Sequence, residues 1–252
     1  MAKRQRLDKF LAHMGFGTRR EVRALLRAKR VILNGQRVTT GDLKIDPTQD
    51  QVLVDGEEVK GEEFSYLMLN KPAGYISATK DRFAPTVLDL VPEDQRVRDL
   101  APVGRLDKDT EGLLLLTNDG PLAHRLLAPA SRVPKTYFLR VAGEVTPAER
   151  EVLAAGVVLD DGYRTLPAEI DILTSGEVSE LLLTIYEGKF HQVKRMLRAV
   201  GKEVTYLQRR SMGNLILDPN LALGECRPLK EEEIKGLKEW TKPRMVAGEK
   251  DS

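Results

Sequence analysis

The segment from Gly104 to Gly120 constrains the fold more than any other part of the chain. It reads Gly-Arg-Leu-Asp-Lys-Asp-Thr-Glu-Gly over residues 104–112, continues as four leucines over 113–116, and closes with Thr-Asn-Asp-Gly over 117–120. A run of leucines of this length must be buried, whereas an arginine and three carboxylates need contact with water. We therefore expect a charged turn held against a buried strand, an arrangement that can present a catalytic carboxylate.

The charge of the chain is distributed unevenly along its length. Residues 1–40 hold eleven basic and two acidic side chains, a net charge of +9, while the remaining 29 basic and 36 acidic side chains give −7. This pattern is expected when a basic module that binds a polyanion is joined to a mildly acidic body.

Length and composition indicate an ordinary globular protein. A chain of 252 residues with 41% hydrophobic and 31% charged residues forms one large or two smaller domains. No stretch reads as a signal peptide or as a membrane span, so we place the protein in the cytoplasm. The single cysteine, Cys226, excludes an internal disulfide and a metal site built from cysteines.

The basic module alternates helix and turn signals. Apolar residues at 7, 10, 11 and 14 predict an amphipathic helix, and Thr18 with Glu21 predicts a capping box at the start of a second. Asn34-Gly35 predicts a type I′ hairpin between strands at 31–33 and 36–38, and another short strand is expected at 51–54. The arginines of the second helix could form a plain solvated face, but a run of one sign favours contact with RNA.

The rest of the chain predicts an α+β fold rather than a doubly wound sheet, because strand signals outnumber helix signals and do not alternate with them regularly. The expected elements are strands at 66–69, 135–141, 181–185, 204–207 and 215–217, and helices at 121–127, from 146 onward and at 191–200.

Several kinds of chemistry have no support in the sequence. His13, His124 and His191 show no metal-ligand spacing, and no dinucleotide fingerprint, phosphate loop or nucleophile elbow is present. Asp107 and Asp109 could share one face of an extended segment about 6.5–7 Å apart. A glycosidase-type pair of carboxylates therefore stays open, with a charged surface turn as an equally simple alternative.

The N-terminal segments resemble the S4 RNA-binding domain. The resemblance rests on Arg-Leu-Asp-Lys-Phe-Leu at 6–11, Thr-Arg-Arg-Glu-Val at 18–22 and Val-Ile-Leu-Asn-Gly at 31–35. The family presents basic side chains to structured RNA, recognised largely through phosphates and shape. The implied contacts are Arg19, Arg20, Arg23 and Lys29.

Further motifs resemble pseudouridine synthases of the ribosomal small-subunit synthase A type. They are Leu-Asn-Lys-Pro-Ala-Gly at 69–74, the 104–120 segment, Lys-Thr-Tyr at 135–137, Glu-Gly-Lys-Phe-His-Gln-Val-Lys-Arg-Met-Leu at 187–197, Gly-Glu-Cys-Arg-Pro-Leu at 224–229 and Glu-Glu-Glu-Ile at 231–234. The resemblance covers nearly the whole chain. It implies conversion of an RNA uridine into its C-glycoside isomer, without a metal or cofactor.

The resemblance also assigns roles to individual residues. Asp107 takes the place of the essential aspartate, Lys194 that of the basic residue paired with it, and Tyr137 that of the tyrosine that stacks on the target base. Arg105 is implied to contact RNA near the vacated base or to brace the loop. Lys194 stands where relatives often carry arginine, and lysine offers a point charge instead of a planar fork. An exposed helix position for Lys194 and ordinary core packing for Tyr137 are the alternatives.

We therefore predict an S4 RNA-binding domain at 1–60, a linker at 61–64, a pseudouridine synthase domain at 65–236 and a tail at 237–252. The catalytic domain should contain a mixed, mainly antiparallel sheet with flanking helices, beside the small α/β S4 domain. The expected substrate is one uridine of 16S ribosomal RNA within a small-subunit assembly precursor. A 23S ribosomal RNA substrate, or a non-catalytic RNA-binding assembly factor, is the alternative. We expect a monomer.

Overall fold

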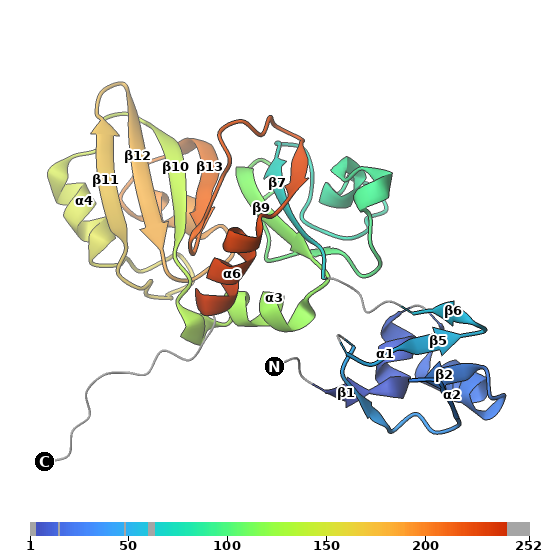
Figure 1. The fold of residues 1–252 in the computed structure, drawn as a ribbon. Coiled ribbons are helices and arrows are strands. Elements are labelled where there is room, and N and C mark those ends of the chain that lie inside the picture. Colours follow the sequence, from blue (N-terminus) through green and yellow to red (C-terminus); the bar gives the residue numbers. More distant parts are fainter. Residues whose placement is uncertain (1–3, 15, 48, 60–63, 241–252) are drawn as a thin grey trace, which may run out of the picture. The chain divides into compact units, whose positions relative to one another are not determined.

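The computed structural model describes residues 4–14, 16–47, 49–59 and 64–240. The chain divides into two compact units, Met1–Phe64 and Ser65–Ser252, each considered by itself (Figure 1). Of the predicted linker at 61–64, only Phe64 belongs to the described residues.

The first unit packs two helices against short antiparallel strands. Its elements are β1 (Gln5–Arg6), α1 (Leu7–His13), α2 (Arg19–Arg27), β2 (Val31–Leu33), β3 (Gln36–Val38), β4 (Lys44–Ile45), β5 (Val52–Val54) and β6 (Glu57–Glu58). The main sheet has the order β3-β2-β5-β6, and β1 pairs with β4. Leu7, Leu11, Val22 and Leu26 of the helices are fully buried and form one core with the strand residues Val31 and Val52.

The local predictions for this unit are confirmed. Thr18 caps α2, and its side chain and that of Glu21 form the reciprocal hydrogen bonds of a capping box. Asn34 and Gly35 have φ values of 48° and 80°, as a type I′ turn between β2 and β3 requires. Both features depend only on adjacent residues, which is why the sequence predicted them.

The second unit is built on one large sheet. Its elements are β7 (Tyr66–Lys71), η1 (Val87–Leu90), η2 (Glu93–Gln95), β8 (Ala101–Pro102), β9 (Glu111–Thr117), α3 (Gly120–Leu127), η3 (Pro129–Ser131), β10 (Lys135–Ala142), α4 (Pro147–Ala154), β11 (Glu169–Thr174), β12 (Val178–Ile185), α5 (Gln192–Ala199), β13 (Val204–Met212), β14 (Leu215–Ile216), β15 (Cys226–Pro228) and α6 (Glu231–Trp240). The strand order is β11-β12-β10-β13-β9-β7-β15, with β14 beside β13 and β8 beside β9.

The predicted α+β class with a mixed, mainly antiparallel sheet is confirmed. Neighbouring strands run antiparallel except β9 and β13, which pair in parallel through Gln208 with Glu111 and Arg209 with Gly112. This parallel contact joins the two halves of the sheet, and it begins at Glu111, the last carboxylate of the charged turn.

Gly112 makes that contact possible. Its φ is +96°, a conformation that side-chain-bearing residues rarely adopt, and a Cβ atom there would lie 2.3 Å from the carbonyl oxygen of Arg209. The glycine thus allows β9 to approach β13 directly behind the charged turn.

The leucine run is buried on both faces of β9, as predicted. Leu114 and Leu116 belong to one core cluster, and Leu113 and Leu115 belong to another. The first cluster includes side chains of α4 and α5, and the second includes side chains of α3 and α6. Helices therefore cover parts of both faces of the sheet, and α3 and α6 lie side by side (Figure 1).

The C-terminal segment corrects the predicted domain boundary at 237. Helix α6 continues to Trp240, and Leu237 is fully buried, so the first four residues of the predicted tail are helical and one of them belongs to the core. The sequence pattern at 234, 237 and 240 is apolar at helical spacing, which explains this burial. The remaining tail, 241–252, lies outside the described residues.

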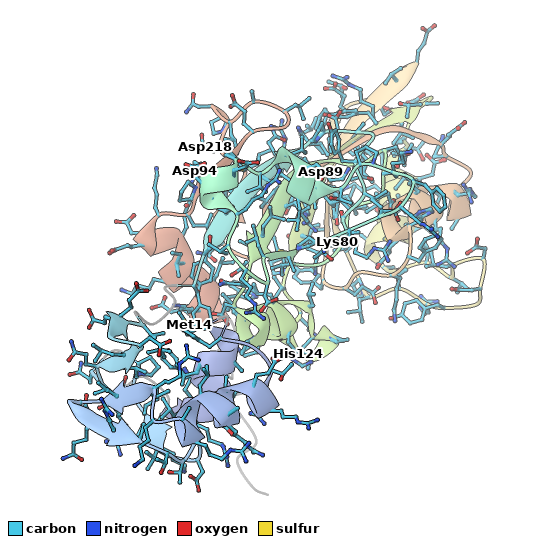
Figure 2. The ribbon with its side chains drawn as sticks, turned by 90° about the vertical axis from the view of Figure 1, so that its right-hand side faces the viewer. Met14, Lys80, Asp89, Asp94, His124 and Asp218 are labelled. Atoms are coloured by element: carbon cyan, nitrogen blue, oxygen red, sulfur yellow. The ribbon has the colours of Figure 1, made fainter. Side chains whose placement is uncertain are left out.

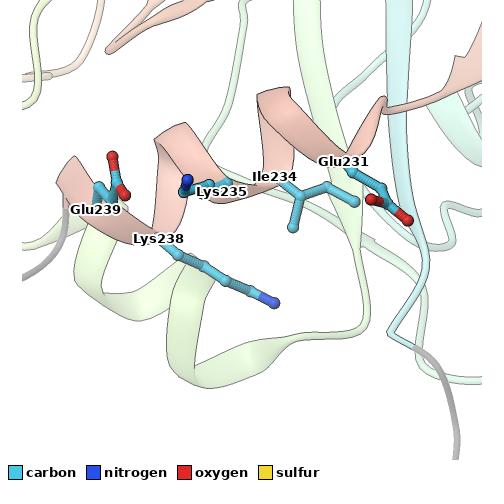
Figure 3. Close-up of a pocket in the computed structure, with 5 residues that line it drawn as sticks. All are labelled: Glu231, Ile234, Lys235, Lys238 and Glu239. Atoms are coloured by element: carbon cyan, nitrogen blue, oxygen red, sulfur yellow. The ribbon is translucent and has the colours of Figure 1, made fainter.

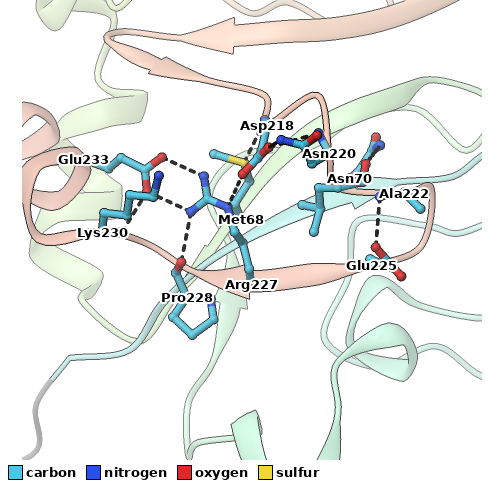
Figure 4. Close-up of polar contacts among 11 residues, drawn as sticks. Met68, Asn70, Asp218, Asn220, Ala222, Glu225, Arg227, Pro228, Lys230 and Glu233 are labelled. Carbon is cyan, nitrogen blue, oxygen red and sulfur yellow. Dashed lines mark hydrogen bonds and ion pairs between the residues drawn. The ribbon is translucent and has the colours of Figure 1, made fainter.

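Ion pairs fasten α6 to the edge of the sheet. Arg227 on β15 lies 2.8 Å from Asp218 and 2.8 Å from Glu233 on α6 (Figure 4). A shallow groove runs along α6 and is lined by Glu231, Ile234, Lys235, Lys238 and Glu239 (Figure 3). All of its lining residues come from this helix, so it is separate from the charged turn.

Within the described ranges, no helix is both long and apolar enough to cross a bilayer.

Candidate active site

Asp107 lies on a loop that is anchored to the hydrophobic core. Its neighbour Leu106 is buried, and the backbone of Leu106 is fixed by Ser77, whose hydroxyl donates to the Leu106 carbonyl at 2.9 Å and accepts from its N–H at 3.0 Å. The Asp107 side chain keeps 26% of its surface exposed. The carboxylate is therefore accessible from a loop whose backbone is anchored.

Lys71 braces the same loop from inside the protein. Its fully buried ammonium donates to the carbonyl oxygens of Pro72 at 3.0 Å, Lys108 at 3.3 Å and Thr110 at 2.8 Å. The N–H of Gly74 also donates to the Lys108 carbonyl, at 2.7 Å. Lys71, Gly74 and Ser77 thus hold the backbone on both sides of Asp107.

Burial sets the titration of this lysine. Desolvation lowers the pKa of the Lys71 ammonium to about 8, and the carboxylates of Asp109, Glu111 and Asp107 oppose the shift. The strand β7 also extends through Lys71, two residues beyond its predicted end at 69. Nothing in the local sequence distinguishes such a lysine from a solvated one.

Lys194 reaches the loop from α5. Its Nζ atom lies 3.4 Å from Asp107 Oδ2 and 2.6 Å from Asp109 Oδ1, so one ammonium faces both carboxylates. The hydrogen bond from Lys194 lowers the pKa of the Asp109 carboxyl. The resemblance paired Lys194 with Asp107 alone, and the structure adds Asp109 to the cluster.

His191 is a site residue that the sequence analysis missed. Its Nε2 atom lies 3.5 Å from Asp107 Oδ1, and Lys194 Nζ lies 3.4 Å from the other carboxylate oxygen, Oδ2. Metal-ligand spacing, which the three histidines lack, gives no indication of this contact. The spacing of His191 and Lys194, three residues apart at the start of one helix, is the signal that could have placed both at the same carboxylate.

Tyr137 lies on β10, in the core cluster that also contains Leu106 of the Asp107 loop. It is 8% exposed. Across the sheet it pairs with Leu183 of β12 and Arg209 of β13. No hydrogen bond joins its hydroxyl to another residue in the described ranges, so both core packing and a role at the site fit this position.

Two buried cationic side chains, Lys135 and Arg209, lie on the strands next to Tyr137. Arg209 donates from Nε to the Leu113 carbonyl at 2.8 Å and ties β13 to β9, while its buried Nη2 has no hydrogen-bond partner among the described residues. Burial, with a further contribution from Arg209, lowers the pKa of the Lys135 ammonium to about 8. These side chains support the sheet on which Tyr137 sits.

The predicted RNA contacts are exposed. Arg105 points into solvent and forms no ion pair with a residue that the structure describes. In the first unit, Arg19, Arg20 and Lys29 are exposed, whereas the guanidinium of Arg23 lies 3.4 Å from the buried carboxylate of Asp8. Arg6 also pairs with Asp8, at 3.0 Å. Arg23 is therefore partly engaged within the fold.

The loop beyond Ser77 carries exposed cationic and aromatic side chains. Lys80 projects from this loop (Figure 2), and Phe83 is 94% exposed. Asp81 accepts from the N–H groups of Phe83 and Ala84, at 2.8 and 2.9 Å, and so gives the tip a defined turn.

The arrangement is suited to chemistry by a carboxylate. Asp107 sits on an anchored loop between the ammonium of Lys194 and the imidazole of His191. Among the described residues, no group of three histidine, cysteine or acidic side chains could hold a metal ion. The geometry supports nucleophilic or proton-transfer chemistry by Asp107.

Comparison with known proteins agrees with this geometry. The model of the RNA pseudouridylate synthase family matches residues 65–199, and that of the S4 domain matches residues 5–51. A crystal structure of a pseudouridylate synthase superposes with a TM-score of 0.65 at 37% sequence identity, covering 92% of this chain and 99% of that one.

Curated relatives match over almost the full length. A Bacillus subtilis protein described as an uncharacterized RNA pseudouridine synthase is 50% identical over 236 residues, which cover 93% of this chain and 98% of the relative. Ribosomal small subunit pseudouridine synthase A of Yersinia pestis is 42% identical, covering 91% of this chain and 96% of the relative. The Escherichia coli protein of the same name is 41% identical, with 91% and 98% covered.

Proposed function

The chain belongs to the RNA pseudouridylate synthase family and carries an S4 domain, and we propose that it isomerises one uridine of 16S ribosomal RNA. The observation that carries the catalytic part is the position of Asp107, held between Lys194 and His191 on a loop braced by Lys71. The small-subunit target draws its support from the relatives named ribosomal small subunit pseudouridine synthase A.

The reaction exchanges one bond for another at the same ribose. The N1–C1′ bond breaks, the uracil turns within the site, C5 bonds to C1′, and the hydrogen lost from C5 is balanced by one gained at N1. No atom is gained or lost overall. In this proposal Asp107 either adds to the sugar or removes its 2′ proton, and both roles need the same ionised carboxylate.

Lys194 and His191 act on that carboxylate. Their nitrogen atoms face different oxygens of Asp107, at 3.4 and 3.5 Å, and so hold the plane of the carboxylate in one orientation. A fixed orientation favours attack on a substrate positioned above the loop. Tyr137 supplies the aromatic face for the extruded base, which loses its stacking partners when it leaves the RNA helix.

The S4 domain supplies affinity for the RNA. Arg19, Arg20 and Lys29, with the exposed part of Arg23, contact phosphates, and Arg105 contacts RNA near the vacated base. This division places most of the salt-dependent binding in the first unit and the chemistry in the second.

Mapping of pseudouridine in ribosomal RNA from cells lacking this protein tests the proposal. Loss of one pseudouridine from 16S RNA is the expected result. Loss from 23S RNA would replace the proposed substrate with the other subunit's RNA. An unchanged map in both RNAs would favour a non-catalytic assembly factor.

A further inference from the structure

We propose that the stacked rings of Phe190 and His191 form a platform for an unpaired RNA base next to the target uridine. The inference rests on the proposed function, because it assumes that an RNA strand lies over Asp107. It assigns a binding and positioning role to Phe190, a residue outside the catalytic set predicted from the sequence.

The two rings leave one aromatic face open. Their centroids lie 3.7 Å apart with an interplanar angle of 20°, which is a stacked arrangement. Phe190 nevertheless keeps 75% of its surface exposed. One face of the phenyl ring is therefore covered by the imidazole, and the other is available to a further ring.

The platform is joined directly to the reacting group. The Nε2 atom of His191, the inner ring of the stack, lies 3.5 Å from Asp107 Oδ1. A base on the open face of Phe190 would be separated from the carboxylate of Asp107 by two rings, those of Phe190 and His191. Stacked rings of this kind lie about 3.4 Å apart. That position suits a nucleotide adjacent in the strand to the uridine in the site.

The backbone fixes the platform in place. His191 has a φ of 49° and a ψ of 31°, a left-handed conformation that is uncommon for a residue with a side chain. The adjoining turn is tied down by Gln192, which accepts from the Lys189 N–H at 2.9 Å and donates to the buried Glu187 at 2.8 Å. Strained residues that are held by their surroundings cluster at functional sites.

The charges beside the platform suit a nucleotide. Asp160, Asp161, Phe190, His191, Arg195 and Arg198 line one open pocket of about 460 Å³. Arg195 pairs with both aspartates and so offsets part of their negative charge. Arg198 is exposed and has no ion pair within the described part of the chain, which leaves its guanidinium free for a phosphate.

An RNA base is the occupant that these features fit together. Extruding a uridine exposes the faces of its neighbours, and an aromatic side chain restores part of the lost stacking. Stacking on a protein ring tolerates any base, whereas sequence would be read by hydrogen bonds elsewhere. The platform therefore contributes binding energy and alignment of the strand, not the choice of nucleotide.

Steady-state kinetics of three Phe190 variants test the inference. The full-length protein acts on unmodified transcripts of 16S and 23S RNA labelled with tritium at C5 of uridine, and tritium release measures the reaction. Phe190→Ala and Phe190→Leu remove the aromatic ring, and Phe190→Trp keeps one. Leu173→Ala, which removes a 49% exposed apolar side chain from β11, is the control.

Loss of the ring is expected to raise KM about 5- to 150-fold, the range that corresponds to about 1–3 kcal/mol of stacking. The value of kcat should stay within about twofold, and Phe190→Trp and Leu173→Ala should match the wild type. A wild-type KM in both Phe190→Ala and Phe190→Leu would overturn the inference. A loss of kcat at unchanged KM would also overturn it, because Phe190 would then act only through His191. A wild-type enzyme inactive on both RNAs would instead overturn the proposed function.

Discussion

Asp107 and Asp109 share a single ammonium group, and the nearer carboxylate is not the one proposed to react. Lys194 Nζ lies 2.6 Å from Asp109 and 3.4 Å from Asp107. The two differ in environment, since the Asp109 side chain is 72% exposed and that of Asp107 is 26% exposed. Asp109 acts in this arrangement as an outer partner that positions Lys194 beside the inner carboxylate.

Asp109→Asn is expected to lower kcat by no more than about fivefold, because an exposed ion pair contributes only about 0–1 kcal/mol. Lys194 keeps Asp107 as its partner in this variant. Single-turnover rates of Asp109→Asn and Asp107→Asn on the same RNA provide the comparison. Equal inactivity of the two variants would show that the cluster works as a pair and not through Asp107 alone.

Lys71→Met tests the buried brace through the pH dependence of stability. Burial holds the folded-state pKa of Lys71 at about 8, below the ordinary value of 10.5, so between these pH values the unfolded chain binds more protons. The free energy of unfolding of the wild type, minus that of Lys71→Met, should therefore rise with pH across this window.

The slope of that difference should approach, but not exceed, about 1.4 kcal/mol per pH unit. Urea denaturation of both proteins at several pH values from about 8 to about 9.5 measures it. Subtracting the variant removes the parallel contribution of Lys135, which titrates in the same range. A difference that stays flat or falls with pH would contradict the assignment of Lys71 as a buried cation.

Gly112→Ala should destabilise the second unit by more than about 2 kcal/mol. A positive φ alone costs a side-chain-bearing residue about 1–2 kcal/mol, and here the added Cβ also meets the Arg209 carbonyl at 2.3 Å. Gly143→Ala is the matched control, because Gly143 has a φ of +80° and open space around it. If thermal unfolding shows that Gly112→Ala and Gly143→Ala destabilise the protein equally, the close approach of β9 to β13 is not what requires glycine at position 112.

Arg19→Ala combined with Arg20→Ala should flatten the salt dependence of RNA binding. Each lost phosphate contact lowers the slope of log K against log salt by about 0.7 to 0.9. Arg30→Ala is the control, because Arg30 is already paired with Asp55 in two hydrogen bonds. A binding titration in which all three proteins give the same slope would exclude these arginines from the phosphate contacts.

The features that the sequence predicted well are local ones. The capping box of Thr18, the turn at Asn34-Gly35 and the burial of the leucine run each depend on adjacent residues. The membership of the site depends on the chain-wide resemblance, because Asp107 and Lys194 are brought together only by the sheet and α5.

The features that the sequence missed depend on tertiary contacts. Lys71 belongs to the motif at 69–74, and only the folded chain surrounds its ammonium with carbonyl oxygens. His191 has no metal-ligand partner, and its contact with Asp107 arises from a left-handed residue at the start of α5. The parallel pairing of β9 with β13 joins segments about a hundred residues apart, which no local pattern specifies.

Replacement of the chromosomal gene by one encoding Asp107→Asn tests the central claim most directly. The amide keeps the size of the side chain and removes its charge, so the protein should fold and bind RNA while losing the reaction. One pseudouridine should disappear from 16S RNA in these cells and should return when a wild-type copy of the gene is supplied. The same pseudouridine at wild-type level in the Asp107→Asn cells, with the variant protein as the only copy, would contradict it.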